Sequence, residues 1–135
     1  MNVAGDRSLQ AEVLLGLLAE RARPGERPEE VLLDLGLVSD RDFAMELAVR
    51  SGLPFTDLRD FVPDERLFLY VPLVNAISER VVPIVLVDDR LHVASVYLQP
   101  RLEGVRRHFP KLDLAIEIAP RGQVLAALNA VAREL

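Results

Sequence analysis

The sequence predicts an α+β fold in which a helical first part precedes a small three-stranded sheet covered on one face by helices. Apolar residues recur every three or four positions through the first third of the chain, and two β-branched runs around an acidic turn follow. After the first helices, the predicted order is β-β-α-β-α. We expect one domain over residues 1–135, with a helical part at about 7–52 and an α/β part at about 53–135.

An amphipathic helix is predicted between Ser8 and Arg23, and Pro24-Gly25 ends it. A second helix is expected to begin near Pro28, because the first helical position does not need the backbone N–H that proline lacks. Gly36 is placed to end this helix. The apolar stripe predicted for this second helix consists of Val31, Leu32 and Leu35.

A third helix is predicted between Ser39 and Gly52. Ser39 is a good N-cap, and Asp42 stands three residues later, where a capping-box acid would lie. Gly52 suits a left-handed C-cap, and Pro54 prevents the helix from continuing. Its expected buried face consists of Phe43, Leu47 and Ala48.

The second half begins with two short helical segments, one opened by residues 62–65 and one over Leu73 to Arg80. A β-hairpin is then predicted from Val81–Val87 and Leu91–Val96, joined through Asp88-Asp89.

Pro83 places the first strand of this hairpin at a strand start or a sheet edge. We expect a helix over Leu98 to Phe109 and a third strand over Leu112–Ile118, whose alternation predicts one solvated face. A C-terminal helix is lined by Val124, Leu125, Leu128 and Val131.

Composition excludes several classes of function. The net charge of −5 disfavours nucleic acid as a partner, and no apolar run approaches the ~20 residues that span a bilayer. The N-terminus lacks the pattern of a signal peptide, so we expect a cytosolic location. The chain has no cysteine and therefore no disulfide or thiolate metal site.

Catalytic motifs are also missing. The only lysine, Lys111, follows proline and precedes leucine, so there is no phosphate-binding P-loop. His92 and His108 follow no metal-ligand spacing, and no serine stands in a Gly-x-Ser-x-Gly elbow. Asp88-Asp89 is explained by turn chemistry. We therefore expect no enzyme activity and no metal.

An ordered set of short segments resembles the N-terminal domain of the ATPases that drive type II secretion and type IV pilus assembly. In chain order, these segments are Leu33–Ser39, Ser51–Phe55, Leu69–Pro72, Val81–Ile84 and Asp89–Ala94. The pattern departs from the family after Ala94, where Leu98-Gln99-Pro100 stands in place of an Asp-Pro pair.

This resemblance implies a non-catalytic adaptor domain that docks a motor ATPase to the cytoplasmic domain of an inner-membrane platform protein, or to the cognate ATPase itself. The domain would then be cytoplasmic, either free or held peripherally at the inner membrane through a protein partner. The chain is either part of a longer ATPase or a freestanding regulatory domain with another partner.

The resemblance also implies an alternative function, because some family members bind cyclic di-GMP through tandem motifs that open with Arg-Leu-Gly. The residues that match one such copy are Arg27, Leu32 and Gly36. Pro28-Glu29 replaces its Leu-Gly, and Arg50 replaces its closing glutamine. Pro28 offers no N–H to a phosphate, and Glu29 is expected to place negative charge beside the ligand.

The last candidate feature is a set of arginines, in a chain whose only lysine is Lys111. They form either a solvated face or contacts with an acidic partner. These arginines are Arg21, Arg23, Arg27, Arg101, Arg106 and Arg107.

Overall fold

The computed structural model describes residues 27–134 of the chain. The helix expected between Ser8 and Arg23 lies outside the described residues. The elements are α2 (Pro28–Asp34), α3 (Asp40–Ser51), the 3-10 helix η1 (Glu65–Leu69), α4 (Leu73–Glu79), β1 (Val81–Val87), β2 (Arg90–Ser95), α5 (Glu103–His108), β3 (Asp113–Ile118) and α6 (Arg121–Arg133). The fold is α+β, as the sequence predicted, with the β-β-α-β-α order in its second part.

Helix α2 begins at proline and ends before Gly36, which has a left-handed φ of 71°. Its buried face differs from the predicted one. Leu32 and Leu33 are buried, whereas Leu35 is 57% exposed. The prediction of Leu35 was wrong because this helix is only seven residues long, and Leu35 is its C-cap, on the solvent side of the last turn.

Helix α3 has both caps that the sequence predicted. The hydroxyl of Ser39 accepts a hydrogen bond from the Asp42 N–H at 3.1 Å. Gly52 ends the helix with φ 74° and ψ 11°, a left-handed conformation that costs glycine little. Phe43 and Leu47 are buried on the face that was expected.

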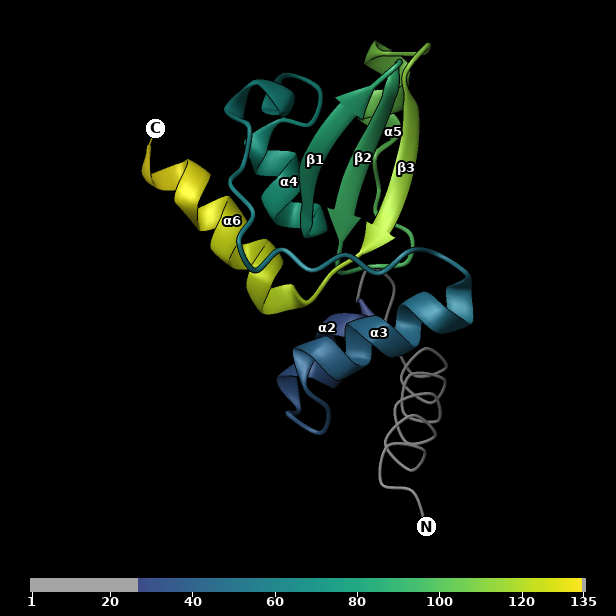
Figure 1. Ribbon diagram of the computed structural model, residues 1–135, viewed down its shortest axis with the longest axis vertical. Coiled ribbons are helices and arrows are strands. Elements are labelled where there is room, and N and C mark those ends of the chain that lie inside the picture. The colour runs from purple at the N-terminus through teal and green to yellow at the C-terminus, as the bar shows by residue number, and fades with distance from the viewer. Residues whose placement is uncertain (1–26, 135) are drawn as a thin grey trace.

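The sheet has the order β1-β2-β3, with β1 antiparallel to β2 and β3 parallel to β2. In Figure 1, the arrows of β2 and β3 accordingly point the same way, toward α2 and α3. Asp88 and Asp89 form the hairpin turn with positive φ values of 49° and 64°. Pro83 lies in the outer strand, where the register shifts between Pro83 and Val85, so it occupies an edge and a bulge.

The connection from β2 to β3 corrects one prediction. The helix expected over Leu98 to Phe109 forms only from Glu103 to His108, because residues 98–102 are an irregular segment that contains Pro100. Since β2 and β3 are parallel, this segment and α5 together make the crossover.

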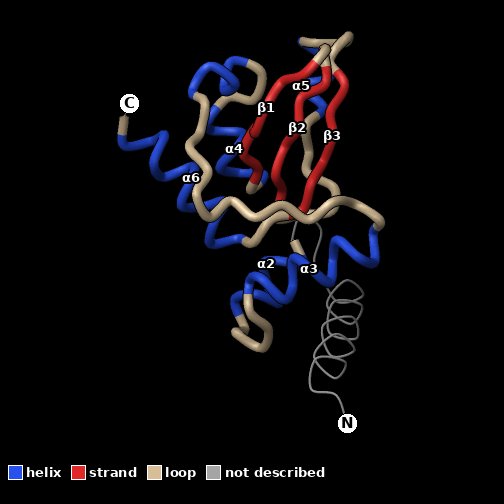
Figure 2. Tube along the Cα trace, viewed as in Figure 1, coloured by secondary structure: helices blue, strands red, loops and turns tan. Residues whose placement is uncertain are grey.

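Helices α4 and α6 lie on the β1 side of the sheet, and α2 and α3 lie at one end of it (Figure 1). Helix α6 contacts β1, β2, α3 and α4. Figure 2 shows the loop after α3 crossing the lower end of the sheet, where Phe55 forms a parallel bridge with Ile118 at the edge of β3. The buried core is continuous from Leu32 to Val93 and Leu128. Within the described residues, no helix is long and apolar enough to cross a membrane.

Candidate functional site

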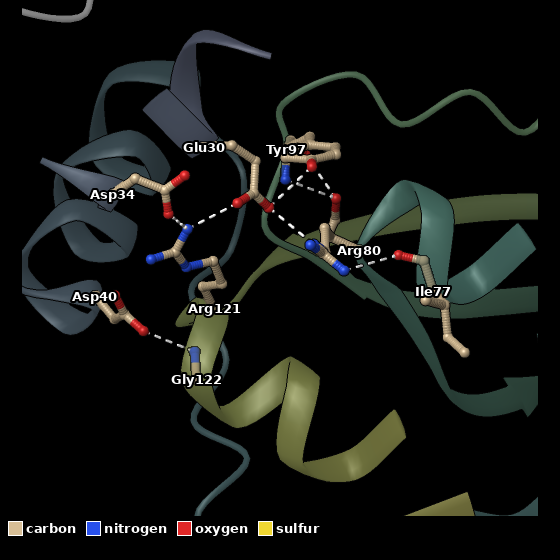
Figure 3. A network of polar contacts seen from close by, with 9 residues as sticks. Glu30, Asp34, Asp40, Ile77, Arg80, Tyr97, Arg121 and Gly122 are labelled. Carbon is tan, nitrogen blue, oxygen red and sulfur yellow. Dashed lines mark hydrogen bonds and ion pairs between the residues drawn. The ribbon is translucent and has the colours of Figure 1, made fainter. Parts of the chain in front are cut away.

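A polar network joins the helical part to the α/β part, with Glu30 of α2 at its centre (Figure 3). One oxygen of Glu30 accepts hydrogen bonds from Arg80 Nε and from the Tyr97 hydroxyl, both at 2.9 Å. The other accepts from Arg121 Nη1 at 2.7 Å, and the same nitrogen lies 2.7 Å from Asp34. Three segments that are distant from α2 in sequence thus meet on one carboxylate.

The pKa values of this network follow from its geometry. Burial alone raises the pKa of Glu30, but hydrogen bonds from Arg80, Arg121 and Tyr97 outweigh it and bring the pKa below its ordinary value. Burial and the Glu30 carboxylate raise the pKa of Tyr97. Glu30 is therefore ionised and Tyr97 neutral at neutral pH, which makes this a fixed tie and not a proton-transfer pair.

Beside this network lies Arg27, immediately before α2. Its Nη2 donates to Glu79 at 2.6 Å, its Nη1 donates to the Gln99 carbonyl at 2.9 Å, and its guanidinium stacks over the Tyr97 ring at 4.6 Å. The Arg27–Glu79 pair is partly buried, with side chains 18% and 14% exposed. Glu79 also accepts from the Arg101 N–H at 2.6 Å. The arginine is therefore held in place by groups of the chain itself.

Arg27 also lines an open cleft of about 520 Å³ between the start of α2 and the β2–α5 connection. Two further arginines and one glutamate also line it, so the cleft is lined by three positive charges and one negative charge. Its lining residues are Arg27, Leu98, Gln99, Pro100, Arg101, Glu103, Arg106 and Ile116. Guanidinium groups around a cleft of this size suit a phosphate or carboxylate ligand.

Comparisons with known proteins identify the fold and the family. A family model for the MshEN domain matches residues 51–134, which is more than half of the chain. This chain belongs to the MshEN domain family. The family is the N-terminal domain of type II secretion and type IV pilus ATPases, as the sequence segments predicted. No curated protein matches the chain.

Solved structures with the same fold extend beyond the matched segment. One is described as MshE with cdg, at 23% identity and a TM-score of 0.65, and it covers 97% of this chain and 99% of that chain. Another is the N-terminal domain of XpsE, at 24% identity and a TM-score of 0.65, with 96% of each chain covered. A second crystal form of that domain has 27% identity and a TM-score of 0.62, covering 92% of this chain and 80% of that chain.

In this MshEN domain, the three residues of the predicted nucleotide motif do not form one site. Arg27 lines the cleft, but Leu32 is fully buried in the core and Gly36 lies at the end of α2, outside the cleft lining. Glu29 is not among the residues that line the cleft, but its carboxylate lies next to one that is. It is 8% exposed, and its carboxylate accepts the Leu98 N–H at 3.2 Å. The carboxylate that neutralises Arg27 is Glu79.

The other predicted candidates lie in different places. Arg101 and Arg106 reach the cleft, Arg107 is exposed, and Arg21 and Arg23 lie outside the described residues. His92 pairs with Glu117 across β2 and β3 at 2.8 Å. Among the described residues, no group of three or more His, Cys, Asp or Glu side chains could hold a metal ion.

Sequence reasoning missed the partners that fix the arginines. Glu79 ends α4, Arg80 is the C-cap of α4, Tyr97 follows β2, and Arg121 begins α6. Nothing in their local spacing indicates that these residues converge, because each of them is separated from its partner at the start of α2 by about fifty residues or more. A weak signal was the position of Glu29 and Glu30 directly after Pro28, in the first turn of α2, where the helix dipole alone favours acidic residues.

Proposed function

We propose that this MshEN domain is a non-catalytic adaptor that docks a secretion or pilus motor ATPase to the cytoplasmic domain of an inner-membrane platform protein. Its place is cytoplasmic, at the inner membrane through that partner. Family membership over residues 51–134 carries the proposal, because this segment includes all three strands together with α4, α5 and α6.

The polar network supports a docking role over a catalytic one. Its charged groups are engaged with one another: Glu30 with Arg80 and Arg121, and Arg27 with Glu79. Such ties hold two parts of a surface in one fixed geometry, which lowers the entropic cost of binding a protein partner. Acid–base catalysis would instead require a group with a pKa near neutrality that faces a substrate.

The test is a pull-down from the source cell with the 135-residue chain as bait, followed by mass spectrometry. We expect a platform protein of a secretion or pilus system to be enriched over a control bait of similar size and charge. Direct binding is then measured with the purified cytoplasmic domain of that protein. A bait that recovers only proteins unrelated to such machinery would refute the proposal.

Cyclic di-GMP is the second candidate ligand, and the position of Arg27 favours it. Arg27 lies on a cleft with Arg101 and Arg106, and a structure of the same fold is described as MshE with cdg. Arginine planes stack on guanine and fork onto phosphates. The obstacle is Glu79, since a ligand phosphate that contacts Arg27 must displace this carboxylate at a Coulombic cost.

Calorimetric titration with cyclic di-GMP tests this second function with two opposed variants. Glu79→Gln frees Arg27 from its ion pair and should strengthen binding, whereas Arg27→Ala should abolish it. Asp113→Asn, which removes one negative charge on the exposed Arg90–Asp113 pair, controls for net charge. Absence of heat with the wild-type chain and with both Glu79→Gln and Asp113→Asn would eliminate cyclic di-GMP as a ligand.

A further inference from the structure

Strand β1 has an edge that pairs with no segment among the described residues. Its inner edge is bonded to β2, and no backbone hydrogen bond joins its outer edge to another described segment. The opposite edge of the sheet differs, because Thr56 N–H donates to the Ile118 carbonyl at 2.8 Å and Ile118 N–H donates to Pro54. An open edge presents N–H and C=O groups that can pair with another strand.

The two halves of this edge are not equally protected. Pro83 and the bulge at Ile84 both discourage strand addition at the beginning and middle of the strand. The second half, residues 85–87, lies beyond the bulge and contains neither proline nor lysine. Val85 and Val87 in this half are 44% and 51% exposed. The unprotected half is therefore apolar as well as open.

A groove of about 500 Å³ runs between this half of β1 and η1. Three consecutive strand residues form one wall, so the groove follows the strand edge. The lining residues are Asp64, Arg66, Leu67, Leu69, Tyr70, Ile84, Val85 and Leu86. Leu69 is 72% exposed here, although it lies only two residues after the buried Leu67 in η1. An added strand could place its alternate side chains against this apolar wall.

The charges around the groove define the occupant. Arg66 is engaged by Asp64 at 2.9 Å, so it offers little net positive charge. Glu65 begins η1 and shares a hydrogen bond with Glu134. This hydrogen bond and the repulsion between the two carboxylates raise the pKa of Glu65. Asp88 and Asp89 follow at the end of β1. A cationic side chain from another molecule would relieve this repulsion.

We propose that residues 85–87 and the adjoining η1 groove receive an extended, basic and apolar segment of the platform partner, which pairs with β1 as an additional strand. The inference rests on the proposed docking function and specifies its surface. A second copy of this chain is a poor occupant, because its own edge carries the same carboxylates and its net charge is −5.

Hydrogen exchange with the purified cytoplasmic domain of the platform protein as probe tests the proposal. We expect amide exchange at residues 85–87 to slow in the complex. Leu69→Lys and Val85→Lys, which place cations against a basic segment, should each weaken binding about tenfold or more. Val49→Lys is the matched control, because Val49 is also an exposed valine, at 79%, but lies on α3. Amide spectra of each free variant verify that it is folded.

The outcomes separate the two proposals. If the wild-type chain and both edge variants bind the platform domain with the same affinity, the strand proposal is wrong and the docking function stands. The same conclusion follows if the amides of α3 are protected in the complex and Val49→Lys is the variant that weakens binding. If the wild-type chain does not bind at all, both are wrong. A concentration-dependent dimer that Leu69→Lys abolishes would assign the edge to a second copy and also overturn the proposal.

Discussion

At the scale of single residues, Glu30 contributes most to the joint between the two parts. Its side chain is 19% exposed and accepts hydrogen bonds from two arginines and a tyrosine. Glu30→Gln keeps the shape but removes the charge, so we expect a loss of about 1–3 kcal/mol of unfolding free energy, measured by urea denaturation. Asp113→Asn on the exposed Arg90 pair is the control, and its effect should stay within about 1 kcal/mol. Equal effects of the two changes would contradict this role.

The same residue gives the chain a pH dependence whose sign is fixed. Hydrogen bonds lower the pKa of Glu30 in the folded state. The stabilisation that ionised Glu30 contributes is therefore fully present above its unfolded-state pKa of about 4.3, and it is lost as the pH falls through its folded-state pKa. The difference in unfolding free energy between wild type and Glu30→Gln should therefore be largest at neutral pH and shrink below about pH 4. Urea titrations across the acid range measure it, and a difference that grows on acidification would refute the assignment.

At the scale of elements, the two best-defined glycine positions predict opposite outcomes for the same substitution. Gly52→Ala forces a Cβ into the left-handed region at φ 74° and should cost about 1–2 kcal/mol. Gly104→Ala is the matched change within α5, where φ is not positive and an added Cβ meets nothing within 4 Å. It should stabilise by up to about 1 kcal/mol. Thermal unfolding of both variants measures the contrast, and a stabilising Gly52→Ala would contradict the cap.

How well each element could be predicted depended on whether its signal was local. The caps of α3 and the acidic turn of the hairpin were predicted because Ser39, Gly52 and Asp88-Asp89 act within a few residues. The start of α5 was misplaced because apolar periodicity continued through residues 98–102, where Pro100 prevents regular structure. The alternation of apolar and polar residues in β3 does not indicate that this strand pairs parallel to β2, because the direction of a strand depends on the path of the crossover that precedes it.

At the scale of the whole molecule, the helical part and the α/β part share one core. Leu32 of α2 is as fully buried as Val93 of β2, and both belong to the same cluster. Sequence reasoning could identify Arg27 as a binding candidate but not its neutralisation by Glu79, because 52 residues separate them. The cleft could not be predicted either, since α2 and the β2–α5 connection form its walls only after the chain has folded.

This shared architecture predicts how the two parts open. Arg121 of α6 connects to Glu30 and Asp34 of α2 through one nitrogen, so Arg121→Ala removes a tie between the parts and leaves the sheet intact. Native-state hydrogen exchange should show amides of α2 and α3 exchanging about tenfold to a hundredfold faster, as the loss of about 1.5–3 kcal/mol implies. Amides of β2 should change little, and Arg107→Ala at an exposed position of α5 should leave both sets unchanged. If β2 accelerates as much as α2, the two parts open only by global unfolding, and Arg121 contributes to overall stability without acting as a separate tie.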